Sequence, residues 1–94
     1  MTRLTSRRWL VTGEVQGVGF RWYILSRARE LEVVGWVSNL EDGSVEVVAK
    51  GLGRALTSLD GFVRRGPPGA KVSQVTTSDV PHEIVDTKSF NIKR

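Results

Sequence analysis

The residues most able to do chemistry lie in one glycine-rich segment, 13–21, which reads GEVQGVGFR. A strand-like stretch precedes this segment and a helix-like stretch follows it. Glycine lets backbone N–H groups come close to a bound group, because it has no Cβ to block the approach. At a strand–loop–helix junction, these N–H groups and the positive end of the helix dipole converge. The segment therefore predicts a cradle for an oxyanion or a phosphate group.

Arg21 ends the segment and falls in the first turn of the predicted helix. A cation there opposes the helix dipole by about 0.3–1 kcal/mol. An anion held between the guanidinium group and the loop N–H groups would make the arrangement favourable. A planar guanidinium also binds a tetrahedral oxyanion through two hydrogen bonds, which a lysine cannot do. The alternative, a glycine-rich turn beside a solvated arginine, stays open on these residues alone.

Two common nucleotide-binding motifs do not fit the segment. The chain contains no Gly-Lys-Ser or Gly-Lys-Thr, which the phosphate-binding loop of nucleotide hydrolases needs. In the dinucleotide fingerprint, read from Gly17, the position of the third glycine is occupied by Trp22. The segment therefore predicts binding of a small anion and not of a nucleotide.

Length and composition limit the other classes of function. The 94 residues, 39% of them hydrophobic, predict a single domain over residues 1–94 with one core. The sequence shows no membrane span or signal segment, so we expect a cytoplasmic protein. The absence of cysteine excludes disulfides and thiolate sites. The only histidine, His82, argues against a zinc site or a Ser-His-Asp triad and is predicted to be an exposed loop residue.

The charge of the chain favours anionic partners. The formal net charge is +4, which raises the local concentration of small phosphates or nucleic acid. The basic residues are spread along the chain, with no block typical of a polynucleotide-binding tail. Arg3, Arg7 and Arg8 are predicted to form a solvated end.

Hydrophobic periodicity and turn residues predict the elements that position the segment. The turn residues Asp42 and Gly43 indicate a hairpin, and the run 66–69 ends the second helix. The order βαββαβ, with a short extra strand, predicts an α+β fold of the ferredoxin-like split βαβ kind. We expect a mainly antiparallel sheet of four to five strands with two helices on one face. The predicted strands are 7–15, 33–39, 44–50, 71–80 and 89–93, and the predicted helices are 21–31 and 54–65.

Three motifs in this order resemble the acylphosphatase family. They are GEVQGVGFR at 13–21, Gly-Trp-Val-x-Asn at 35–39 and Asp-Gly-Ser-Val at 42–45. The resemblance covers nearly the whole chain, including the Gly-Pro-Pro-Gly turn at 66–69. Several matched motifs in the expected topology are far more specific than the glycine-rich loop alone. One departure is Glu14, because the family often has a basic residue at this position.

The resemblance implies hydrolysis of acyl phosphates, the mixed anhydrides of carboxylic and phosphoric acid, without a metal or other cofactor. It implies that Arg21 clamps the phosphoryl group and that Asn39 orients the attacking water. The alternative for Asn39 is a strand-end residue that opens the following turn, where asparagine is common. The resemblance further implies that the phosphoryl group is held by the backbone N–H groups of Gln16, Gly17, Val18, Gly19, Phe20 and Arg21.

Two other classes of function stay open. The first is a binding module that keeps the anion cradle without turnover. The second is an RNA-binding domain, although the strand 45–48 lacks the aromatic residues on which RNA bases stack. For the enzyme we expect a monomer with a small acyl phosphate as its substrate and inorganic phosphate or sulfate as an inhibitor. We expect neither a membrane nor a nucleic acid as partner.

Overall fold

The computed structural model describes residues 3–94 as one five-stranded sheet and two long helices. The predicted order of elements is confirmed, and most boundaries fall within two residues of the prediction. The main difference is the first strand, which begins at Leu4 and not at residue 7, because its early residues pair with the end of the third strand. The elements are β1 (Leu4–Glu14), α1 (Phe20–Glu30), β2 (Val34–Asn39), β3 (Val45–Leu52), α2 (Gly53–Arg65), β4 (Lys71–Asp79), the short 3₁₀ helix η1 (His82–Ile84) and β5 (Phe90–Ile92).

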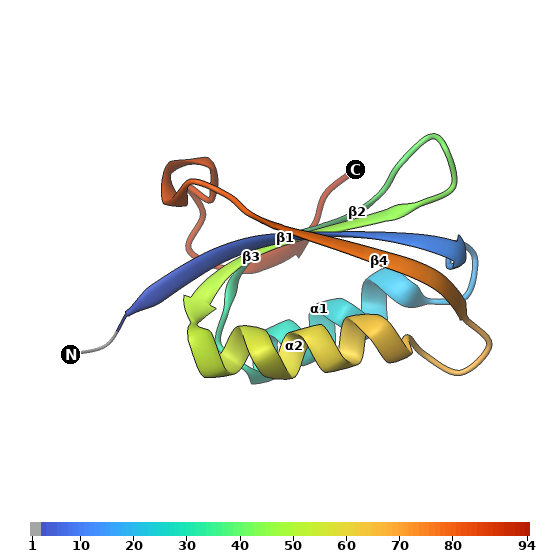
Figure 1. The fold of residues 1–94 in the computed structure, drawn as a ribbon, viewed down its shortest axis with the longest axis horizontal. Coiled ribbons are helices and arrows are strands. Elements are labelled where there is room, and N and C mark those ends of the chain that lie inside the picture. The colour runs from blue at the N-terminus through green and yellow to red at the C-terminus, as the bar shows by residue number, and fades with distance from the viewer. Residues whose placement is uncertain (1–2) are drawn as a thin grey trace.

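The strands lie in the order β4-β1-β3-β2-β5. Neighbouring strands are antiparallel except for β2 and β5, which run parallel. Both helices cover the same face of the sheet (Figure 1). This is the predicted ferredoxin-like α+β fold.

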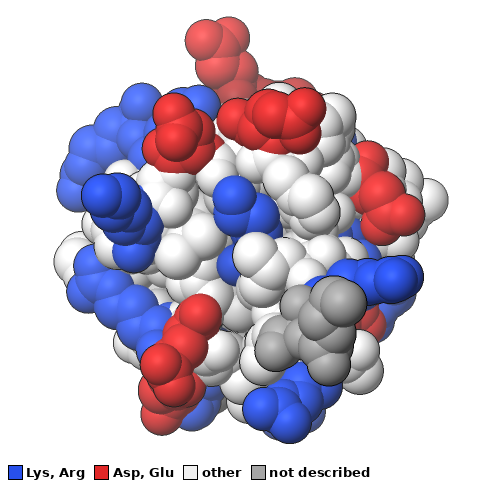
Figure 2. Space-filling view, turned by 90° about the vertical axis from the view of Figure 1, so that its left-hand side faces the viewer, with Lys and Arg blue, Asp and Glu red and all other residues white. Residues whose placement is uncertain are grey.

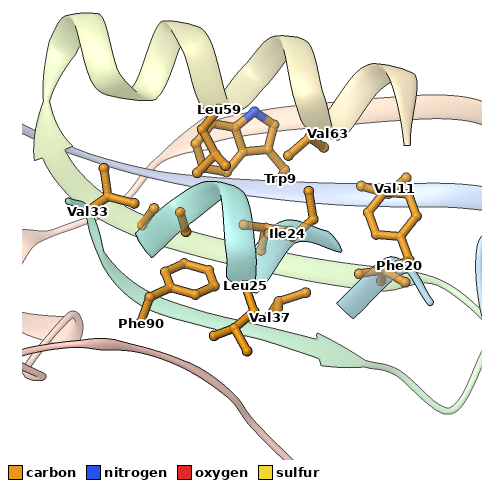
Figure 3. Packing of buried hydrophobic residues seen from close by; sticks show 14 of the residues in the cluster. Trp9, Val11, Phe20, Ile24, Leu25, Val33, Val37, Leu59, Val63 and Phe90 are labelled. Carbon is orange, nitrogen blue, oxygen red and sulfur yellow. The ribbon is translucent and has the colours of Figure 1, made fainter. Parts of the chain in front are cut away.

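The core lies between the sheet and the two helices (Figure 3). Because side chains alternate along a strand, one set of strand residues faces the helices. The helices meet them with apolar residues three or four positions apart, the spacing of one helix face. The fully buried members of this core include Trp9 and Val11 of β1, Val45, Val47 and Ala49 of β3, Ile24 and Ala28 of α1, and Leu56, Leu59 and Val63 of α2.

The segment between β4 and β5 crosses the face of the sheet that lies away from the helices (Figure 1). The Val80 N–H donates to the Ser6 carbonyl at 3.2 Å, and Ser6 Oγ is hydrogen-bonded to His82 Nδ1. His82 is exposed, as predicted, but this hydrogen bond ties it to a buried serine. The prediction of a solvated end was wrong for Arg7 and Arg8, which lie within β1 and are half-buried. Arg8 also pairs with Glu46 at 2.7 Å.

Charges are mixed at the end of the molecule opposite the β2–β3 turn. Figure 2 shows acidic side chains among the basic ones on this surface, with no continuous basic patch. Within residues 3–94, no helix has the length and apolar character needed to span a membrane.

Trp9 joins the core to helix α2 through a hydrogen bond to a carboxylate. Its side chain is fully buried, and its Nε1 donates to Asp60 Oδ1 at 2.9 Å. Burial alone would raise the pKa of Asp60, but the hydrogen bonds from Trp9 and Arg64 outweigh it and hold this pKa below its ordinary value. The ionised carboxylate is therefore the form that stabilises the fold.

We predict that Trp9→Phe lowers the free energy of unfolding by at least about 2 kcal/mol at pH 7, because a charged acceptor loses its donor and the smaller ring leaves a cavity in the core. A depressed carboxyl pKa contributes stability above the unfolded value of about 3.9, and this contribution is lost as pH falls through the folded value. The difference in free energy of unfolding between variant and parent should therefore be smaller at about pH 2 than at pH 7. Urea unfolding followed by far-UV circular dichroism at both pH values measures it.

Trp36→Phe is a second variant that removes an indole N–H next to a carboxylate. Trp36 is half-buried, and its Nε1 lies 3.3 Å from Glu46 Oε1, a longer contact than that of Trp9. This variant should lose less stability than Trp9→Phe. An equal loss in both variants, or a Trp9→Phe difference that does not change with pH, would contradict the assigned role of the Trp9–Asp60 hydrogen bond.

Candidate active site

The loop between β1 and α1 is anchored in the core at both of its ends. Val15 and Phe20 are 1% and 2% exposed, whereas Gly17 and Gly19 between them are exposed. The loop lies at the same end of the molecule as the turn between β2 and β3 (Figure 1). Two buried anchors so close in sequence leave the intervening backbone little freedom, so the direction of its N–H groups is set by the fold.

Gly17 and Gly19 both have left-handed backbone conformations, with φ of +74° and +78°. Residues with a side chain rarely adopt such angles. A Cβ at either position would meet no protein atom within 4 Å, so the backbone angle and not crowding by the protein favours glycine here. Left-handed residues within a turn point successive N–H groups into one concavity, a geometry that binds anions.

The backbone N–H groups of residues 16–22 have no backbone partner in the described part of the chain. The first backbone hydrogen bond of α1 runs from Tyr23 N to Gly19 O at 3.0 Å. Gly19 caps the helix without a side-chain acceptor, and the first turn has no acidic residue. These donors and the positive end of the helix dipole therefore remain available to an external anion.

Arg21 is the second residue of α1 and is half-buried. Across residues 3–94, it forms no ion pair with a carboxylate. The nearby acid Glu14 instead lies 3.7 Å from Lys71 on β4, and both side chains are exposed. An exposed pair of this kind contributes little stability, but its lysine offsets the negative charge next to the loop.

Asn39 is the last residue of β2, opposite Val45 of β3. Its side-chain Oδ1 is buried and lacks a hydrogen-bond partner among the described residues. Its amide Nδ2 likewise donates to none of residues 3–94. A buried polar atom without a partner costs about 1–3 kcal/mol, and such atoms need a functional or structural explanation.

The turn after Asn39 is held by its own hydrogen bonds. Leu40 N donates to Ser44 O at 2.9 Å, and Gly43 N donates to Leu40 O at 3.2 Å. Asp42 Oδ1 accepts from the hydroxyl and the backbone N–H of Ser44, and these two bonds lower the pKa of Asp42. The hairpin predicted from Asp42 and Gly43 is confirmed.

The side chain of Gln16 connects the loop to this hairpin. Its Nε2 donates to the carbonyl oxygens of Leu40 and Ser44, at 2.8 and 2.9 Å. Sequence reasoning favoured a backbone role for Gln16 and left a contribution of its side chain to the site open, without a partner for it. Both acceptors are main-chain atoms 24 and 28 positions away, so no pattern of residue types could have shown the contact.

The structure thus brings the predicted site residues to one end of the sheet. The six residues predicted to form the cradle, 16–21, lie in the loop and the first turn of α1, and the Gln16 side chain is hydrogen-bonded to the hairpin that carries Asn39. Over the described range 3–94, no three His, Cys, Asp or Glu side chains come together as possible metal ligands. Chemically, the arrangement offers N–H donors without partners in the described chain, one guanidinium group and one neutral amide.

Comparison with known proteins identifies the family of this chain. The acylphosphatase family model matches residues 7–92. An acylphosphatase of Koribacter versatilis is 44% identical over 94% of this chain and 79% of its own length, and one from Bifidobacterium longum is 40% identical over 97% and 94%. The crystal structure of acylphosphatase from Bacillus subtilis superimposes with a TM-score of 0.89 at 35% identity, covering 98% of this chain and all of that one. The chain therefore belongs to the acylphosphatase family of hydrolases.

Proposed function

We propose that this chain hydrolyses acyl phosphates to a carboxylate and inorganic phosphate without a metal ion. The observation that carries the proposal is the row of unpaired N–H groups at the start of α1, next to an arginine without a carboxylate partner in the described chain. The names of the relatives support the choice of substrate, because they are acylphosphatases.

The cradle, formed by the backbone N–H groups of residues 16–21, binds the phosphoryl oxygens in this proposal. Arg21 adds two parallel hydrogen bonds and a full positive charge. Phosphoryl transfer depends mainly on positioning and on stabilising the charge of the phosphoryl oxygens. Donors that are already oriented by the anchored loop need no reorganisation when that charge changes.

Asn39 holds the attacking water in this proposal. Its buried Oδ1 leaves Nδ2 to donate a hydrogen bond to the water oxygen. An amide cannot remove a proton at neutral pH, so the proton passes to a phosphoryl oxygen of the substrate. The water oxygen bonds to phosphorus as the bond to the acyl oxygen breaks, and the carboxylate leaves with the electron pair. A carboxylate with a pKa near 4 needs little help from a general acid.

We predict release of inorganic phosphate from an aryl acyl phosphate at an undiminished rate in excess EDTA, because the fixed positive charge comes from the protein itself. The rate with and without EDTA, measured against a reaction without enzyme, checks this. Loss of turnover in EDTA would overturn the metal-free mechanism. Binding of phosphate without any turnover would instead support an anion-binding module.

We predict that Arg21→Gln abolishes both phosphate binding and turnover, because Arg21 contacts the phosphoryl group in the ground state and in the transition state. Arg21→Lys should also be badly impaired, since a point charge cannot replace the planar two-donor group. Phosphate titrations followed by the amide signals of residues 16–21, together with kcat/KM, measure both effects. A lysine variant with near-parental kcat/KM would contradict the two-bond contact.

We predict that Asn39→Ala lowers kcat by roughly 10²-fold, because the water loses its position. Competitive inhibition by inorganic phosphate should stay nearly unchanged, since Asn39 is not part of the cradle. Circular dichroism and a melting curve show whether the variant is folded. Normal turnover in a folded variant would reduce Asn39 to a turn residue, and loss of phosphate affinity together with kcat would place it in the cradle.

A further inference from the structure

The orientation of the Gln16 amide is determined by its contacts. A primary amide nitrogen carries two hydrogens, and Nε2 of Gln16 lies within hydrogen-bond distance of two carbonyl oxygens. The reversed amide would place Oε1 against the same two carbonyls, acceptor against acceptor. Both hydrogens are therefore donated to the carbonyl oxygens of Leu40 and Ser44, which lie on either side of the turn between β2 and β3.

We propose that Gln16 is a positioning residue that sets the distance between the phosphoryl group and the attacking water. Its backbone N–H belongs to the cradle, and its side chain holds Leu40, the residue that follows Asn39. One residue thus contacts both halves of the site. This inference rests on the proposed function, because it assumes that the cradle binds phosphate and that Asn39 holds the water.

The hairpin does not need Gln16 in order to form. The Leu40 carbonyl also accepts from Gly43 N, and the Ser44 carbonyl also accepts from Leu40 N. Each acceptor therefore keeps a partner when the Gln16 amide is removed. The side chain of Gln16 restricts where the hairpin lies relative to the loop, and a displacement of about 1 Å at a reacting centre is enough to cost up to about 10²-fold in rate.

The same contact couples the two halves when phosphate binds. Phosphate that orders the backbone of Gln16 also orders the hairpin that its side chain holds, and this coupling is reciprocal. In the parent protein, saturating inorganic phosphate should therefore slow hydrogen exchange at the amides of Leu40 and Gly43. Without the Gln16 amide, phosphate should still bind the cradle but should no longer slow exchange in the hairpin.

The test is Gln16→Met, which keeps the backbone N–H and the length of the side chain but cannot donate. We expect kcat to fall about 10-fold or more and the inhibition constant of inorganic phosphate to change less than about 2-fold. Gln74→Met is the matched control, because Gln74 lies exposed on β4 and its side chain forms no hydrogen bond within the described chain. It should behave as the parent in both measurements.

Gln16→Glu gives a second readout, which a purely structural role would not produce. A carboxylate facing two carbonyl oxygens repels them, so this variant should be slower than Gln16→Met at pH 7. Protonation restores one donor. The ratio of its kcat to that of the parent should therefore rise as pH falls from 7 to about 5, whereas the ratio for Gln16→Met should stay constant.

The outcomes separate this inference from the proposed function. If the parent neither binds phosphate nor turns over, the proposed function fails, and the inference fails with it. If the parent is active and Gln16→Met keeps its kcat and the phosphate effect on hairpin exchange, the inference alone is overturned. Loss of kcat and of hairpin protection with phosphate inhibition retained would support it.

Discussion

The site depends on one constraint, the short connection between two residues that must both be buried. Val15 and Phe20 enter the core from the end of a strand and from the start of a helix, and only four residues join them. The two left-handed glycines, Gly17 and Gly19, make this connection possible. Because the anchors belong to the core, the packing of the whole domain sets the direction of the loop N–H groups.

Binding and water placement are assigned to different parts of the fold. The proposed cradle belongs to the β1–α1 connection, and Asn39 belongs to the β2–β3 hairpin. The buried amide oxygen of Asn39, which has no partner in the described chain, costs stability. The core offsets this cost with contacts elsewhere, such as the Trp9–Asp60 hydrogen bond on the side of α2. Stability and chemistry can therefore be measured separately in this chain.

Local patterns were enough to predict the order of elements and most of their boundaries. The turn residues Asp42 and Gly43, for example, identified the hairpin between β2 and β3. The start of β1 was missed because Leu4 pairs with Leu52, a contact between residues far apart in the chain. The hydrogen bond between Ser6 and His82 of η1 was missed for the same reason.

The candidate site was predictable only in part. The glycines and Arg21 indicated an anion site by residue type, but the water-placing role of Asn39 came from the family resemblance, since asparagine is equally suited to a turn. A role for the side chain of Gln16 could be considered from the sequence, but its partners could not be predicted, because hydrogen bonds to main-chain carbonyls do not depend on the types of the partner residues.

Because Gln16 binds main-chain atoms, the side chains around the site can change without loss of this contact. Gln16 recognises the shape of the hairpin backbone and not its side chains, so the contact places no demand on the identity of Leu40. Between the two carbonyls, Glu41 and Gly43 are exposed. Substitutions that preserve the turn can therefore alter the charge and size of its exposed side chains while the hydrogen bonds from Gln16 remain. This separation leaves room for relatives, or for a designer, to vary the surroundings of the site without rebuilding it.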